Sequence, residues 1–179
     1  GTTSLFDAII AANEADGYAP RVVFTSSIAV FGAPLPDPIS DTHYLTPLTS
    51  YGTQKAIGEM LLNDYSRRGF MDGVALRLPT ICVRPGKPNA AASGFFAGIM
   101  REPLNGMEAI LPVEDDVRHW HASPRAAVDF LTHAASMDTA SLGGNRALSL
   151  PGLCVSVAEQ IEALRDVAGN DAVALIKRQ

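Results

Sequence analysis

Apolar residues along the chain follow two alternating patterns. In the segment 2–16 they recur at the spacing of one face of a helix, and Gly17 follows as a stop signal. The segment 21–27 has three apolar residues in a row and then small polar residues, as expected of a strand buried on both faces. Helical spacing returns over 49–68, and Gly69 lies just beyond its end.

The same two patterns continue to the end of the chain. A second buried-strand pattern lies in 73–83, where Pro79 predicts an end or a bend because proline cannot join a central ladder. Three more helices are predicted, over about 92–101, over 123–137 and over 156–169. Ser123 is the expected N-cap of the second, and Ser156 with Glu159 forms a capping box at the start of the third. Two short strands are predicted over 108–113 and 146–152. This alternation predicts an α/β fold with a mainly parallel sheet.

The composition narrows the class of protein. The 179 residues, 47% of them hydrophobic and 18% charged, suit one folded domain with a small appendage at most. A net charge of −5 argues against a nucleic-acid partner. No apolar run approaches the roughly 20 residues that cross a bilayer, and no signal peptide is recognisable. Cys82 and Cys154 are expected to be reduced, buried thiols of a cytoplasmic protein.

Tyr51 and Lys55 are the first candidates for chemistry. They stand four residues apart in a predicted helix, so their side chains share one face. A free tyrosine, with a pKa of about 10, is a poor base, and a nearby ammonium group favours its phenolate. The serines of Thr25-Ser26-Ser27 end a predicted strand and could hold a substrate oxygen beside the tyrosine. Such a trio suits proton transfer to or from an alcohol or carbonyl, with a separate hydride acceptor.

Three segments in order carry a family resemblance. "VVFTSSIAVFG", "TSYGTQKAIGEMLL" and "VALRLPTICVRPG" resemble successive landmarks of the extended short-chain dehydrogenase/reductase family, which includes nucleotide-sugar epimerases and dehydratases. The resemblance implies a Rossmann-like, doubly wound parallel sheet with part of a smaller C-terminal substrate region. It also implies NAD as the cofactor. The expected division is 1–85 for the cofactor-binding part and 86–179 for substrate-binding and remaining Rossmann elements.

The resemblance also assigns roles to residues. It makes Tyr51 the acid/base, with Lys55 holding the nicotinamide ribose and Ser27 positioning the substrate oxygen. Ser26 is a second choice for the serine role and a cofactor contact. The remaining expected contacts are Pro79 and Ile81 for the cofactor and Thr80, Arg118 and His119 for the substrate.

Within the family, two segments indicate the type of substrate. "RLPTICVRPGKPNAAASGFF" and "VRHWHASPRAA" resemble members that oxidise a small sugar acid such as D-erythronate at the 2-hydroxyl. An arginine should then meet the carboxylate. Arg118 is the first choice, with Arg84 and Lys87 as alternatives. A nucleotide-sugar epimerase is the alternative enzyme. A non-catalytic NAD-binding regulatory module is less favoured, because such modules often lose the tyrosine or lysine.

Three further expectations remain. No G-x-x-G-x-x-G segment for a cofactor pyrophosphate is present, so the chain is expected to be a fragment that is inactive alone. No metal site is expected, although His119 and His121, with His43 or His133, could form one. A homodimer is expected from the resemblance. The apolar face of helix 49–68 would serve either this dimer or the chain's own sheet through Leu61, Leu62 and Tyr65.

Overall fold

The computed structural model describes residues 1–86 and 93–179 and divides the chain into two compact units. The first unit contains residues 1–78 and 128–150, and the second contains 79–127 and 151–179. The chain therefore leaves the first unit after Leu78 and returns to it within a helix.

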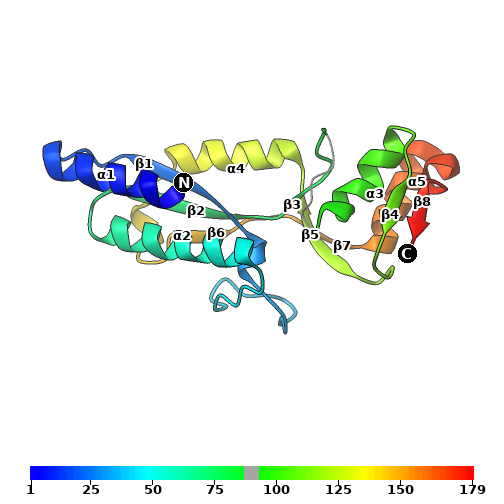
Figure 1. Cartoon of the computed structure of the whole chain (residues 1–179), viewed down its shortest axis with the longest axis horizontal. Coiled ribbons are helices and arrows are strands. Elements are labelled where there is room, and N and C mark those ends of the chain that lie inside the picture. The colour runs from blue at the N-terminus through cyan, green and yellow to red at the C-terminus, as the bar shows by residue number, and fades with distance from the viewer. Residues whose placement is uncertain (87–92) are drawn as a thin grey trace. The chain divides into compact units, whose positions relative to one another are not determined.

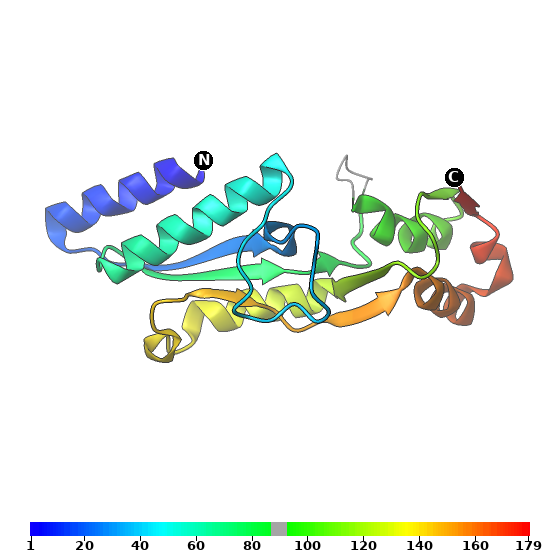
Figure 2. The same cartoon turned by 90° about the horizontal axis from the view of Figure 1, so that it is seen from below.

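The first unit is a three-stranded parallel sheet covered on both faces. Its strands are β1 (Arg21–Ser27), β2 (Asp72–Leu78) and β6 (Ala147–Ser149), in the order β1-β2-β6. Helices α1 (Thr2–Asp16) and α2 (Ser50–Arg67) cover one face, and the part of α4 (Pro124–Ser136) that belongs to this unit covers the other (Figures 1 and 2). This is the predicted parallel α/β arrangement.

Alternate residues of each strand explain the two covered faces. Val22 and Phe24 pack with Phe6 and Leu62 of the two N-terminal helices, whereas Val23 packs on the α4 side. Successive side chains of a strand point to opposite faces, so an unbroken apolar run suits a sheet covered twice. Leu61, Leu62 and Tyr65 all belong to the first of these cores, so they cover the chain's own sheet.

The second unit contains two small sheets and two helices. One sheet has the order β3-β5-β7, from Thr80–Ile81, Arg118–Ala122 and Leu153–Ser156; the other pairs β4 (Ala109–Leu111) with β8 (Ile176–Arg178). Helices α3 (Gly94–Leu104) and α5 (Val157–Val173) share an apolar core with β4. Among the described residues, β5 with β7 is the one antiparallel pairing.

Most element boundaries match the predictions. Gly17 ends α1 with φ of 77°, and β2 stops at Leu78 immediately before Pro79. Ser123 caps α4, and Ser156 with Glu159 forms the capping box of α5. Strands β5, β7 and β8 and the 3₁₀ turns Ile28–Val30 (η1) and Ala140–Leu142 (η2) were not predicted. Residue 92, where the helix over about 92–101 was expected to begin, lies outside the described residues.

Candidate functional site

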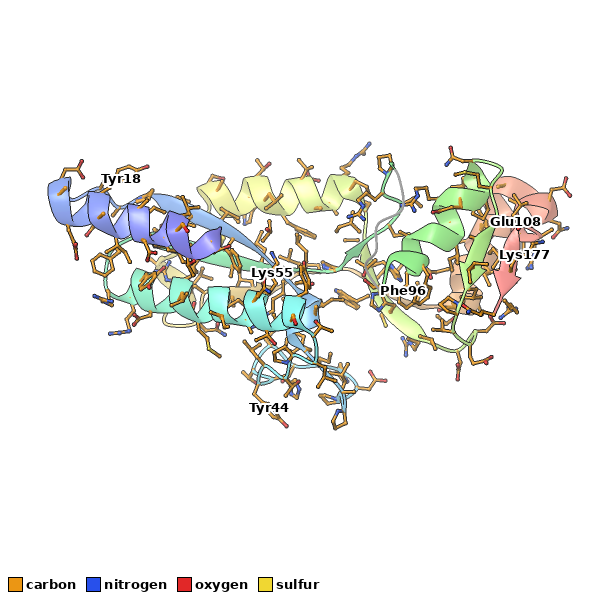
Figure 3. The ribbon with its side chains drawn as sticks, viewed as in Figure 1. Tyr18, Tyr44, Lys55, Phe96, Glu108 and Lys177 are labelled. Carbon is orange, nitrogen blue, oxygen red and sulfur yellow. The ribbon has the colours of Figure 1, made fainter. Side chains whose placement is uncertain are left out.

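The first turn of α2 carries Tyr51, and the next turn carries Lys55. The hydroxyl of Thr49 caps the helix by accepting a bond from the Gly52 amide at 3.0 Å. Lys55 Nζ donates to the carbonyl of Thr25 at 2.5 Å and lies 5.5 Å from the centre of the Tyr51 ring. The two side chains of the i,i+4 pair therefore share one face of α2, where Lys55, labelled in Figure 3, contacts β1.

The two neighbouring serines have different surroundings. Ser26 is buried and donates to Glu59 Oε1 at 2.5 Å. Ser27 ends β1, and its Oγ accepts a bond from the amide of Ala29 at 3.2 Å. No described residue accepts a bond from the Ser27 hydroxyl, so that hydrogen is available to a ligand. The contrast favours Ser27 over Ser26 for contact with a substrate.

A close backbone contact holds Tyr51 near Ser27. A Cβ atom on Gly52 would lie 2.1 Å from the carbonyl oxygen of Ala29, and real Cβ atoms do not approach so closely. The first turn of α2 therefore packs directly on η1, which begins one residue after Ser27. Tyr51 itself remains 55% exposed. The sequence Tyr51-Gly52 contained this signal, since glycine permits a close backbone approach.

The remaining predicted cofactor and substrate residues lie in the second unit. Pro79 is buried, and Ile81 in β3 pairs with Ala122 of β5. Thr80 Oγ1 lies 2.7 Å from His119 Nε2, within hydrogen-bonding distance. The structure thus brings Tyr51, Lys55, Ser26 and Ser27 together in the first unit, and Thr80 and His119 together in the second.

His119 and His121 lie on one face of β5. Their ring centres are 5.1 Å apart, and the Phe96 ring stacks on His119 at 4.0 Å with an angle of 6° between the planes. Burial and the neighbouring His121 lower the pKa of His119 to about 4, and burial lowers the pKa of His121. Both rings are therefore neutral at neutral pH. No group of three metal-binding side chains occurs among the described residues.

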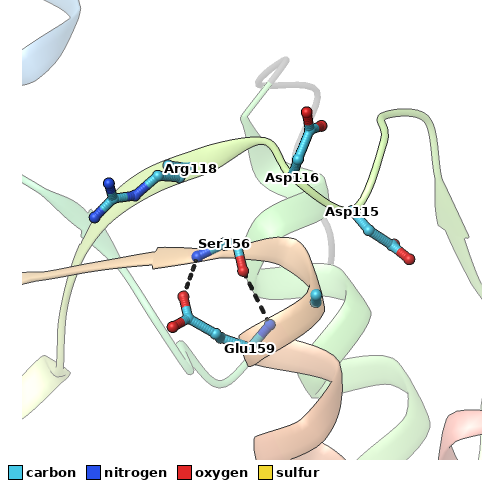
Figure 4. A pocket seen from close by; sticks show the side chains of 6 residues that line it. Asp115, Asp116, Arg118, Ser156 and Glu159 are labelled. Atoms are coloured by element: carbon cyan, nitrogen blue, oxygen red, sulfur yellow. Dashed lines mark hydrogen bonds between the residues drawn. The ribbon is translucent and has the colours of Figure 1, made fainter. Parts of the chain in front are cut away.

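Arg118 points away from this histidine face, because adjacent residues of a strand face opposite sides. It lines an open pocket of about 670 Å³ with Asp115, Asp116, Ser156, Ala158 and Glu159 (Figure 4). The hydrogen bonds that Glu159 receives from the backbone and side chain of Ser156 lower its pKa. The positive charge of Arg118 also contributes to lowering the pKa of Glu159, although the two side chains form no salt bridge among the described residues.

Arg84 and Lys87 are the alternative cationic residues. Arg84 is exposed, and its carbonyl accepts a bond from Arg101 Nη1 at 3.4 Å. Lys87 lies outside the described residues. The three carboxylates around Arg118 make its pocket less favourable for an anion, whereas no described carboxylate pairs with Arg84. Both arginines remain candidates for binding a carboxylate.

A buried ion pair beneath Lys55 was not recognised in the sequence. Glu59 follows Lys55 by one turn, and its carboxylate accepts three hydrogen bonds from Arg77 of β2, the shortest of them 2.8 Å. Glu59 also accepts the bond from Ser26, so one carboxylate links α2, β1 and β2. The guanidinium of Arg77 lies 5.1 Å from the centre of the Phe31 ring, which follows η1.

Comparison with known proteins identifies the family. A match to the model of the NAD-dependent epimerase/dehydratase family covers residues 1–131, more than half of the chain. The chain belongs to this family. The resemblance that the three motifs predicted is thereby confirmed. No helix in the described part of the chain is long and apolar enough to cross a membrane.

Two different names occur among three proteins that are similar to this chain. D-Erythronate dehydrogenase from Cupriavidus necator is 58% identical over 86% of this chain and 48% of its own length. The protein of that name from Haemophilus influenzae is 47% identical over 88% and 50%, respectively. A crystal structure of a nucleoside-diphosphate-sugar epimerase from Agrobacterium tumefaciens is 70% identical, with a TM-score of 0.94, over 99% of this chain and 52% of its own. The chain spans about half the length of the curated relatives it matches.

Proposed function

We propose that the full-length protein containing this chain is an NAD-dependent dehydrogenase of a small sugar acid, such as D-erythronate, and oxidises its 2-hydroxyl group. The observation that carries the proposal is that Lys55 contacts both the Tyr51 ring and the carbonyl of Thr25 near the carboxyl end of β1, the strand that ends at Ser27. The names of two relatives, at 58% and 47% identity, support the substrate.

Tyr51 is the proposed acid/base. Its exposed phenol can take the proton of the substrate hydroxyl as the carbon–oxygen bond becomes a carbonyl, and Ser27 donates a hydrogen bond to the same oxygen. The ammonium of Lys55 lies 5.5 Å from the centre of the Tyr51 ring, so the two side chains can contact the same ligand. NAD, when bound, accepts the hydride from the carbinol carbon.

The residues of the first unit fit the ribose end of NAD. Lys55 Nζ has three hydrogens, and its one acceptor among the described residues is Thr25. Two hydrogens therefore remain for ribose hydroxyls. The family resemblance adds Ser26, Pro79 and Ile81 as cofactor contacts, although the hydroxyl of Ser26 is already bonded to Glu59. The pyrophosphate would need residues other than a G-x-x-G-x-x-G loop of this chain.

Binding of the acid needs a cation and hydrogen-bond donors. Arg118 is the first candidate for the carboxylate, because it is exposed and forms no salt bridge among the described residues, only a longer-range interaction with Glu159. Arg84 is the alternative, because the carboxylates beside Arg118 would repel an acid. The family resemblance adds Thr80 and His119, and because Thr80 Oγ1 lies 2.7 Å from His119 Nε2, His119 is the proposed contact for another oxygen atom and Thr80 supports His119. A carboxylate prefers the two-pronged geometry of arginine.

The same proposal covers assembly and location. A homodimer through the exposed side of α2 fits the family resemblance. A cytoplasmic location fits the two free thiols, Cys82 and Cys154, because disulfides form mainly in oxidising compartments.

A nucleotide-sugar epimerase is the second candidate. It is favoured by the 70% identity to the protein named a nucleoside-diphosphate-sugar epimerase. An epimerase would use the same tyrosine and lysine but would return the hydride to the substrate, so no NADH would accumulate. This difference separates the two candidates.

The deciding experiment follows NADH formation by the full-length protein with a panel of small sugar acids, including D-erythronate. The Tyr51→Phe variant is the matched control, because it removes one hydroxyl group from an exposed ring. Turnover of an acid that the variant loses would support the dehydrogenase. Interconversion of nucleotide sugars without turnover of any acid would replace it with the epimerase.

A further inference from the structure

His119 is held on two sides by residues of the second unit. The Thr80 hydroxyl lies 2.7 Å from Nε2, and the Phe96 ring lies flat against the imidazole at 4.0 Å. Phe96 belongs to the first turns of α3 and is labelled in Figure 3. These contacts leave Nδ1 without a hydrogen-bond partner among the described residues. The ring is therefore fixed in orientation but keeps one nitrogen for a ligand.

The surroundings of His119 disfavour its charged form. His121, 5.1 Å away, is 6% exposed, and neither of its ring nitrogens has a hydrogen-bond partner in the part of the chain that the structure describes. Val155 lies opposite His119 on β7, and Arg118 points to the other face of β5. Phe96, Thr80 and His121 are the groups that contact the ring, and none carries a negative charge. A buried cation without a carboxylate is costly.

A neutral imidazole carries one proton, on either Nδ1 or Nε2. The Thr80 hydroxyl can donate to Nε2, since it has no other acceptor among the described residues. Nε2 would then act as the acceptor, and the proton would lie on Nδ1. In this form Nδ1 can donate to an oxygen atom. A carboxylate or hydroxyl oxygen of a sugar acid accepts such a bond.

We propose that Thr80 and Phe96 are positioning residues that hold His119 as its Nδ1–H tautomer, and that this N–H donates to an oxygen atom of the hydroxy acid. The inference rests on the proposed function. His119 then contributes to binding of the acid as a neutral donor. Thr80 acts through His119 by filling the acceptor site of Nε2.

The test compares Thr80→Val with Thr80→Ser in the full-length protein. Valine has nearly the shape of threonine but no hydroxyl, whereas serine keeps the hydroxyl. Long-range ¹H–¹⁵N NMR correlations report which nitrogen of His119 is protonated. We expect the Nδ1–H form in the wild type and Thr80→Ser, and the Nε2–H form in Thr80→Val.

Kinetics with D-erythronate provides the second readout. Loss of one hydrogen bond to the acid should raise KM about tenfold in Thr80→Val, with kcat changed less than about twofold. Thr80→Ser should restore KM. A wild-type Nε2–H tautomer, or an unchanged KM in an active Thr80→Val enzyme, would overturn the inference and leave the proposed function standing. If the wild-type protein oxidises no acid, the proposed function is wrong, and so is the proposed hydrogen bond from His119 to the acid.

Discussion

The carboxylate of Glu59 and the guanidinium of Arg77 form an ion pair in the interior of the first unit, at 2.8 Å. Their side chains are 2% and 6% exposed. Glu59 lies one turn after Lys55, and Arg77 lies next to the last residue of β2. The pair therefore fixes the face of α2 that carries Lys55 against the sheet.

Glu59→Gln should destabilise the protein strongly, because Arg77 would remain buried without its counter-ion. We expect a loss of about 3–5 kcal/mol in the free energy of unfolding, measured by urea titration. Asp64→Asn is the matched control, since Asp64 pairs with Arg67 on the exposed side of the same helix. That change should cost less than about 0.5 kcal/mol. An equal loss of unfolding free energy in the two variants would show that the buried ion pair contributes no more to stability than the exposed one.

Gly52→Ala should damage both the fold and the proposed catalytic site. The new methyl group would collide with the carbonyl of Ala29, and neither backbone can yield without moving Tyr51 away from η1. We expect destabilisation of at least about 2 kcal/mol and loss of turnover.

Gly98→Ala is the control for this substitution. Gly98 also lies within a helix, but its nearest contact would be an ordinary 3.6 Å from Glu102. Alanine favours the helix there by up to about 1 kcal/mol, so this variant should be as stable as the wild type or more so. Thermal unfolding of both variants measures the difference, and a stable, active Gly52→Ala enzyme would refute the close-contact argument.

The helices could be predicted from the sequence because local signals set them. Apolar spacing, Ser123 and Ser156 as caps, and Gly17 as a stop all act within a few residues. The two-sided burial of β1 likewise follows from three consecutive apolar residues. The contact of Tyr51 with Lys55 needs helical geometry alone.

The features that the sequence did not predict depend on contacts between residues that are far apart in the sequence. Strand β5 contains Arg118, His119 and His121, and such polar residues gave no apolar strand pattern. The Glu59–Arg77 pair depends on how α2 lies on β2, which residue spacing does not specify. The opposite directions of Arg118 and His119 follow directly once β5 is known to be a strand.

Stability should fall as the pH is lowered from about 6.5 to about 4. The pKa of His119 is lowered to about 4 in the folded protein by burial and by His121, so the unfolded chain, with an ordinary pKa of about 6.5, binds more protons in this range. Protonation therefore favours unfolding, by on the order of 3 kcal/mol once pH 4 is reached. Urea midpoints measured across this range report the loss.

Two histidine variants test the source of that pH dependence. His119→Gln should reduce the pH dependence, because one of the two histidines whose pKa is lowered by burial is gone, whereas His121 remains. His133→Gln should leave it unchanged, since His133 is exposed on α4. Similar pH profiles for the wild type and His119→Gln would contradict the assignment.

The exposed side of α2 is the expected interface of the proposed homodimer. Ile57 and Met60 lie three residues apart on one face of the helix, and they are 50% and 60% exposed. Leu61, Leu62 and Tyr65 pack inside the first unit, so Ile57 and Met60 are the apolar residues of α2 available to a second copy. Met60→Lys should place a charge in such an interface and give a monomer in analytical ultracentrifugation. Val167→Lys, at a position 80% exposed on α5, should leave the oligomeric state unchanged. A Met60→Lys protein that sediments like the wild-type dimer would exclude this face as the interface.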